Sequence, residues 1–150
     1  MKKSTTEPFM PADDYGRSLA GFGVNLLVRK IDPVLAFVTE VLGVEVVYAD
    51  PDLAVLRHGG HEFMLHAEHT YDDRPMVART RVANQRGAGC ELRLYDIDPD
   101  AAEGRARVLG HEVLAASEDK PHGLRECYLV DPEGYVWVPG RALPPETDQD

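Results

Sequence analysis

The sequence predicts an α+β fold of two tandem βαβββ modules, because the chain repeats itself and both copies show the same order of strand and helix patterns. The pattern Ile-Asp-Pro…Val-Leu-Gly-x-Glu-Val occurs at 31–46 and again at 97–113. A long repeat that occurs only twice differs from the short, many-fold repeats of solenoids. It indicates a duplicated module, with module one at 21–70 and module two at 87–142 of a single domain of 150 residues.

Each module begins with a strand that is followed by a helix. Alternating apolar residues along both first strands indicate burial on one face. They are Val24, Leu26 and Val28 in module one, and Cys90, Leu92 and Leu94 in module two. An Asp-Pro pair then offers an N-cap carboxylate and a proline at the first helical position, and a glycine ends the helical pattern. These residues are Asp32, Pro33 and Gly43, and Asp98, Pro99 and Gly110.

Three further strands complete each module. They are expected at 44–49, 53–58 and 61–67, and at 112–116, 125–130 and 134–139. Turn residues separate them, such as the glycines at 59–60 and Asp-Pro-Glu-Gly at 131–134. The arginine-rich segment 71–86 has little apolar periodicity and is expected to be a linker. We expect residues 1–20 and 143–150, which are polar or rich in proline, to be tails without regular structure.

The composition argues against several classes of partner. The formal net charge of −10 opposes binding to the phosphate backbone of nucleic acids. The sequence contains no apolar run of transmembrane length, and the first lysines are not followed by the apolar region of a signal peptide. Cys90 and Cys127 form no CxxC pair, so we expect reduced cysteines in a cytoplasmic protein that contacts no membrane.

One stretch is more specific than the repeat. Residues 120–126, Lys-Pro-His-Gly-Leu-Arg-Glu, lead to Asp-Pro-Glu-Gly at 131–134. Together with the duplicated module, this stretch resembles the vicinal oxygen chelate superfamily, which includes glyoxalase I, extradiol dioxygenases and bleomycin-binding resistance proteins. It is most similar to the bleomycin-resistance branch, with His122 where tryptophan is usual. The resemblance implies that the two modules form curled mixed sheets around a cleft, and it implies a homodimer.

The resemblance also implies where a metal would bind. Enzymes of this superfamily take metal ligands from the first and the last strand of each module. The corresponding positions here are Gly23, Met64 (or Leu65 in a shifted alignment), Gly89 and Val138. None of these side chains is an imidazole, a carboxylate or a thiolate, which zinc, iron and manganese require. We therefore expect no metal and no cofactor, and we favour a binding protein over an enzyme.

Strand alternation identifies the residues that share the cleft face with those positions. The expected ligand-binding residues are Asn25, Glu62, Met64, His66, Glu91, Arg93 and Val138. Residues of the opposite parity, including Trp137, are apolar and suit the face covered by the helix. With the resemblance, the polar set predicts binding of a small cationic or aromatic molecule such as an antibiotic. A second interpretation is a self-satisfied network in which Glu62 or Glu91 pairs with Arg93.

Four histidines support an alternative function. They are His58, His61, His66 and His69, in and after one expected hairpin. They are either surface residues at the rim or ligands of a displaced metal site, in which His66 acts with Glu62 or Glu91. The displaced site predicts a metal-dependent lyase, isomerase or dioxygenase with histidine as the general base. A third hypothesis is an interaction module without a small-molecule ligand.

Overall fold

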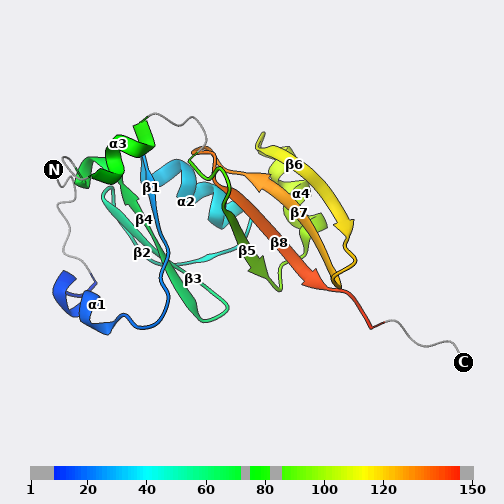
Figure 1. Ribbon diagram of the computed structural model, residues 1–150, viewed down its shortest axis with the longest axis horizontal. Coiled ribbons are helices and arrows are strands. Elements are labelled where there is room, and N and C mark those ends of the chain that lie inside the picture. Colours follow the sequence, from blue (N-terminus) through cyan, green and yellow to red (C-terminus); the bar gives the residue numbers. More distant parts are fainter. Residues whose placement is uncertain (1–8, 72–74, 82–85, 146–150) are drawn as a thin grey trace, which may run out of the picture. The chain divides into compact units, whose positions relative to one another are not determined.

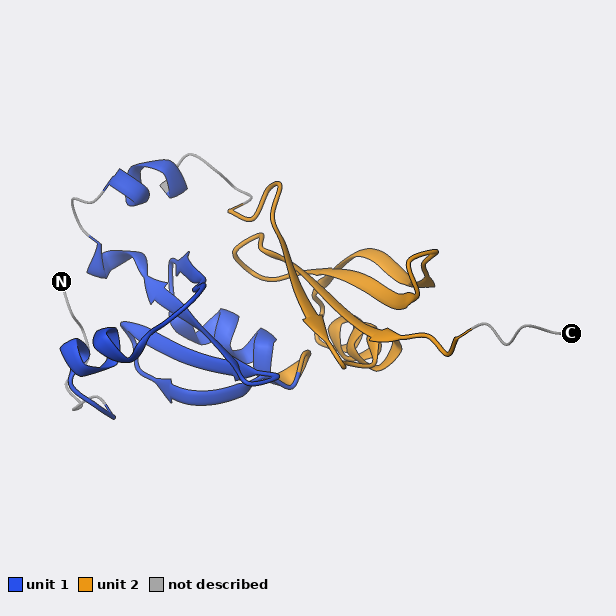
Figure 2. Cartoon of the chain, turned by 60° about the horizontal axis from the view of Figure 1, so that its bottom comes forward, with its two compact units in different colours: residues 1–39, 43–84 blue, residues 40–42, 85–150 orange. Residues whose placement is uncertain are grey.

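The computed structural model describes residues 9–71, 75–81 and 86–145 and shows the expected α+β architecture (Figure 1). These residues form two four-stranded sheets, with strand orders β1-β4-β3-β2 and β5-β8-β7-β6. One pair of strands in each sheet is parallel and the others are antiparallel, so the βαβββ order occurs twice. The chain divides into two compact units, residues 1–39 with 43–84 and residues 40–42 with 85–150 (Figure 2).

Module one has its apolar core on one face of its sheet. Its elements are β1 (Asn25–Val28), α2 (Ile31–Glu40), β2 (Glu45–Ala49), β3 (Leu53–His58) and β4 (His61–Ala67). Val34 and Phe37 of α2 are fully buried, as are Val28, Leu56 and Leu65 of the strands. These residues follow the helical and strand periodicities of the sequence, and burial stabilises each by about 1.5–3 kcal/mol.

Module two repeats this order around a tryptophan. Its elements are β5 (Glu91–Tyr95), α4 (Pro99–Val108), β6 (Glu112–Asp119), β7 (Leu124–Val130) and β8 (Val136–Ala142). Trp137 is buried together with Leu129, Ala102 and Ala106, so it lies on the apolar face as expected. The Trp137 indole N–H donates to Asp131 at 2.9 Å, which satisfies the polar atom of this large side chain.

The repeated residues at the helix ends adopt the expected cap conformations in all but one case. Gly43 and Gly110 have φ values of 69° and 77°, the left-handed conformation expected of C-cap glycines. Asp98 is the N-cap of α4, and its carboxylate accepts from the Asp100 N–H at 3.0 Å. The expectation for Asp32 is wrong, because α2 begins at Ile31 and Asp32 lies inside the first turn. There the carboxylate still interacts favourably with the helix dipole.

Several other boundaries differ from the expectations. Helix α1 (Ala12–Ser18) lies within the expected N-terminal tail, and α3 (Pro75–Arg81) lies within the expected linker. Neither segment has a long apolar stripe, so periodicity alone did not reveal it. A short helix, η1 (Glu68–Thr70), follows β4. Strand β8 begins at Val136 rather than at residue 134, because the turn that precedes it includes Gly134, which has a φ of 88°. None of the helices described is long and apolar enough to cross a membrane.

Candidate functional site

The strand register of module one places the expected polar residues on one face of the sheet. Asn25 is opposite Met64 and Leu27 is opposite His66 in the parallel β1–β4 pair. Glu62 is opposite Arg57 in the antiparallel β3–β4 pair. Directly paired residues point to the same side of a sheet, so Asn25, Glu62, Met64 and His66 share a face. We call it the polar face of module one.

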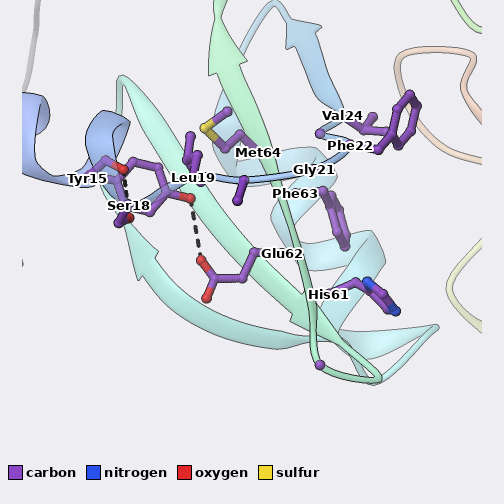
Figure 3. Close-up of a pocket in the computed structure, with 13 residues that line it drawn as sticks. Tyr15, Ser18, Leu19, Gly21, Phe22, Val24, His61, Glu62, Phe63 and Met64 are labelled. Atoms are coloured by element: carbon purple, nitrogen blue, oxygen red, sulfur yellow. Dashed lines mark hydrogen bonds between the residues drawn. The ribbon is translucent and has the colours of Figure 1, made fainter.

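A pocket of about 620 Å³ lies at the start of β4. It is lined by residues of α1, of the segment that leads into β1, and of the β3–β4 hairpin. They are Tyr15, Ser18, Leu19, Ala20, Gly21, Phe22, Gly23, Val24, Gly60, His61, Glu62, Phe63 and Met64. Figure 3 shows Tyr15 and Glu62 facing each other on one side of β4, with Phe63 and His61 on the other. Of the expected ligand-binding residues, Glu62 and Met64 line this pocket.

The pocket also contains residues that the sequence did not single out. Tyr15 and Leu19 belong to or follow α1, in a segment expected to be a tail, and Phe22 precedes β1. Phe22 is 91% exposed, which is unusual for so large an apolar side chain. An aromatic residue within an otherwise polar N-terminal segment is a sign that the segment packs against the rest of the protein. It does not indicate which strand the ring approaches.

The carboxylate of Glu62 provides the negative charge in this pocket. Its Oε2 accepts from the Arg57 guanidinium at 2.7 Å, and its Oε1 accepts from the Tyr15 hydroxyl at 3.4 Å. Arg57 also contacts Glu45 at 3.2 Å. One guanidinium is therefore shared by two carboxylates, and the group carries a net charge of −1. Burial, followed by the charge and hydrogen bond of Glu62, raises the pKa of Tyr15.

Asn25 and His66 form a separate hydrogen-bonded cluster. His66 Nδ1 lies 2.6 Å from Asn25 Oδ1, and Asn25 Nδ2 donates to the Tyr71 hydroxyl at 2.7 Å. The His66 and Tyr71 rings are in edge contact, with centroids 5.6 Å apart. These three residues are not among those that line the pocket. The structure thus divides the polar face into a Glu62 part and a His66 part.

In module two, Arg93 is the centre of an ion-pair network. It contacts Glu91 at 2.8 Å and also pairs with Glu126, whose side chain is 1% exposed. Burial lowers the pKa of Arg93, but hydrogen bonds to Glu91, Tyr128 and Tyr95 outweigh this effect and raise it overall. The self-satisfied pair of Glu91 with Arg93 is therefore present, whereas Glu62 pairs with Arg57 instead. Val138, on the neighbouring strand, is buried.

Arg125, which lies in the stretch that resembles the bleomycin-resistance pattern, has a structural role in module two. Its guanidinium binds Asp100 through two nitrogens, at 2.6 and 2.7 Å, and Asp119 at 2.8 Å. Hydrogen bonds to these two carboxylates raise its pKa. The nearby Glu133 pairs with Arg86 at 2.9 Å.

The residues at the expected metal positions do not fit a metal ion. Gly23 and Gly89 precede β1 and β5, and the register places Asn25 beside Met64 and Arg93 beside Val138. The two glycines have no side chain to bind a metal, and the thioether of Met64 and the isopropyl group of Val138 are poor ligands for zinc, iron or manganese. The neighbouring amide and guanidinium groups are poor ligands as well. Within the described parts of the chain, no three His, Cys, Asp or Glu side chains are grouped as a metal site would require.

The histidines are likewise dispersed. His58 and His61 are paired across the β3–β4 turn, while His69 binds Asp52 at 2.6 Å. His66 and Glu62 share a face, but four residues along a strand separate them by roughly 13 Å. Each has a different partner, Asn25 for His66 and Arg57 for Glu62. The displaced site of His66 with Glu62 is therefore not assembled in module one.

The chain is similar in structure to several solved proteins of low sequence identity. A glyoxalase-related enzyme from Fulvimarina pelagi is 18% identical with a TM-score of 0.66, and the match covers 81% of this chain and 87% of that one. A glyoxalase/bleomycin resistance protein/dioxygenase family enzyme from Burkholderia phytofirmans PsJN is 20% identical with a TM-score of 0.64, covering 81% and 97%. A lactoylglutathione lyase from Agrobacterium tumefaciens is 21% identical with a TM-score of 0.57, covering 81% and 92%.

No protein-family model matches the chain, and no curated protein matches it either. The structural matches show that the chain has the vicinal oxygen chelate fold, which glyoxalases, bleomycin resistance proteins and dioxygenases share. They do not distinguish between these branches. Because one fold hosts several chemistries, the function has to be argued from the site.

Proposed function

We propose that this chain binds a small organic cation with an apolar or aromatic part in the pocket of module one, without the help of a metal. The observation that carries the proposal is the position of Glu62. This carboxylate lines a pocket together with apolar and aromatic residues such as Leu19, Met64 and Tyr15, and it belongs to a group with a net charge of −1. Cationic and aromatic antibiotics belong to this class of ligand.

The contacts of Glu62 favour a cation over a neutral ligand. Oε2 is held by Arg57, whereas the hydrogen bond of Oε1 within the described residues is the long one of 3.4 Å from the Tyr15 hydroxyl. An ammonium group in the pocket would gain a charge-assisted hydrogen bond to Oε1. The ring of Tyr15, which faces Glu62, adds surface for a cation–π contact. The pocket volume also lies within the usual range for small-molecule sites.

Binding of 2-phenylethylammonium tests the proposal. We expect Glu62→Gln to weaken it by about tenfold, or about 1.4 kcal/mol, because the amide keeps the shape but loses the charge. Arg57 retains Glu45 as a partner, so the variant should fold. Calorimetry would compare wild type, Glu62→Gln and the control Glu118→Gln, an exposed carboxylate paired with Lys120 in module two. Equal affinities in all three proteins would contradict the proposal.

The metal-free part of the proposal has its own test. We expect elemental analysis of untagged protein, purified without chelator, to find no stoichiometric transition metal, and EDTA to leave the melting temperature unchanged. A near-stoichiometric metal whose removal lowers the melting temperature would contradict this part and favour the metal-dependent alternative. In that case His66→Ala should reduce the metal content. The homodimer and the cytoplasmic location stay predictions.

A further inference from the structure

The start of β4 presents a main-chain edge to the pocket. The ladder between β1 and β4 begins at the pair Asn25–Met64, three residues after β4 begins at His61. Among the described residues, the register pairs Glu62 with Arg57 of β3 alone. One edge of β4 is thus covered by β3, and in the parts of the chain that the structure describes the other edge has no strand partner before Met64.

The direction of the Glu62 N–H and C=O groups follows from that of Met64, which lies two residues later in β4. The Met64 N–H donates to the Val24 C=O at 3.0 Å, so the amide of Met64 points toward β1. Alternate residues of a strand direct their N–H and C=O groups to the same side. The N–H and C=O of Glu62 therefore point to the side of β1 as well, into the region bounded by the pocket residues Gly23 and Val24.

The chain before β1 leaves this edge open. Gly21 has a φ of 74°, a left-handed conformation that turns the segment out of the line of a strand. A Cβ atom built on Gly21, Gly23 or Gly60 would meet no atom within 4 Å. These three glycines therefore have open space where a side chain would lie, and they line the same pocket as Glu62.

We infer that the ligand of this pocket is a cation that also carries two successive secondary amides, as a short peptide or a peptide-like molecule does. This inference rests on the proposed function and specifies its ligand class. The N–H and C=O of one ligand residue, which belong to two successive amides, pair with the C=O and N–H of Glu62, as an added strand would. The ammonium group contacts the Glu62 carboxylate, as a basic residue does when it lies opposite an acidic one on a neighbouring strand.

The size of the pocket limits the occupant to one or two residues. A volume of about 620 Å³ suits a small molecule and not a long strand. The net charge of −1 on the Glu62 group selects a cation, and the exposed ring of Phe22 and the side chain of Leu19 offer apolar contact to the remainder of the ligand. The pocket would then recognise both the positive charge of the ligand and the positions of its amide groups.

Three probe molecules distinguish the contribution of the ammonium group from that of the amides. The first is N-acetyl-lysine N-methylamide, which has the ammonium group and two successive amides. The second has a methyl group on the α-nitrogen and lacks that N–H donor. The third replaces lysine with norleucine and lacks the charge. We expect the second and the third to bind about tenfold more weakly than the first in NMR titrations of labelled protein. The Glu62 amide resonance should shift with the first probe and exchange more slowly with solvent.

The variant Glu62→Gln makes the assignment specific. It should remove the difference between the lysine and norleucine probes, and it should preserve the difference between the free and the methylated amide. Equal binding of the free and methylated amides would overturn the inference, even if lysine still bound better than norleucine and the proposed function held. Equal binding of lysine and norleucine to wild type would instead contradict the proposed function.

Discussion

Asp131 is a single residue on which the turn before β8 depends. Its Oδ1 accepts from the backbone N–H groups of Glu133 and Tyr135, at 2.8 and 3.1 Å, and its Oδ2 accepts from Trp137. Burial raises its pKa although these hydrogen bonds act in the opposite direction. The sequence motif Asp-Pro-Glu-Gly indicated a turn, but the contact with Trp137 required the folded hairpin.

We expect Asp131→Asn to destabilise the protein by about 1–3 kcal/mol. The amide oxygen can replace Oδ1, but the amide NH₂ would then face the Trp137 N–H and leave a buried donor unsatisfied. Urea unfolding followed by tryptophan fluorescence measures the difference. Asp96→Asn is the control, because Asp96 is exposed with a φ of 60°, where asparagine is well tolerated. A loss of stability as small as that of the control would show that the turn does not depend on this carboxylate.

Among the elements, α4 and β6 are connected by a side chain of the helix. Glu103 accepts from the Ser117 backbone N–H at 2.7 Å through one oxygen, and from Arg107 at 2.8 Å through the other. The Ser117 backbone hydrogen bond, followed by the hydrogen bond from Arg107, lowers the pKa of Glu103. The i, i+4 spacing of Glu103 and Arg107 is visible in the sequence, whereas the contact with β6 is not.

We expect Glu103→Gln to cost about 1 kcal/mol of stability at pH 7. Because the folded pKa is lowered, the advantage of the wild type is present above the unfolded value of 4.5 and disappears as the pH falls through the folded pKa. Urea unfolding between pH 3 and pH 7 checks this. Glu112→Gln, an exposed change at the start of β6, should show no such dependence. A stability difference between wild type and Glu103→Gln that grows toward acid pH would contradict this expectation.

Helix α1 shows why this element was not predicted. None of its residues is buried, so it has no apolar stripe for periodicity to detect. Its position depends on contacts with residues far along the chain, such as Tyr15 with Glu62. Phe9 adds ring contacts with Tyr15 and Tyr48, at centroid distances of 5.7 and 5.3 Å. An expectation from local patterns could not include contacts of this kind.

For the whole molecule, the net charge of −10 has a measurable effect on the proposed binding. We expect the affinity for 2-phenylethylammonium to fall a few-fold as sodium chloride rises from about 50 to 500 mM, because salt screens the long-range attraction. The direct contact with Glu62 should be less affected. Calorimetry at several salt concentrations tests this, with neutral 2-phenylethanol as the control. A cation affinity that does not change with salt would show that the overall charge plays no part.

The sequence by itself determined the two βαβββ modules, the caps of α4 and the apolar faces of the sheets. These features depend on spacing within a few residues, such as the alternation around Leu65 and the glycines at 43 and 110. The tertiary structure alone decided that Glu62 pairs with Arg57 rather than Arg93, and that Asn25 holds His66. It also decided that α1 and the segment before β1 line the pocket. Charged and polar side chains can take many partners, and only the strand register and the contacts between distant segments select among them.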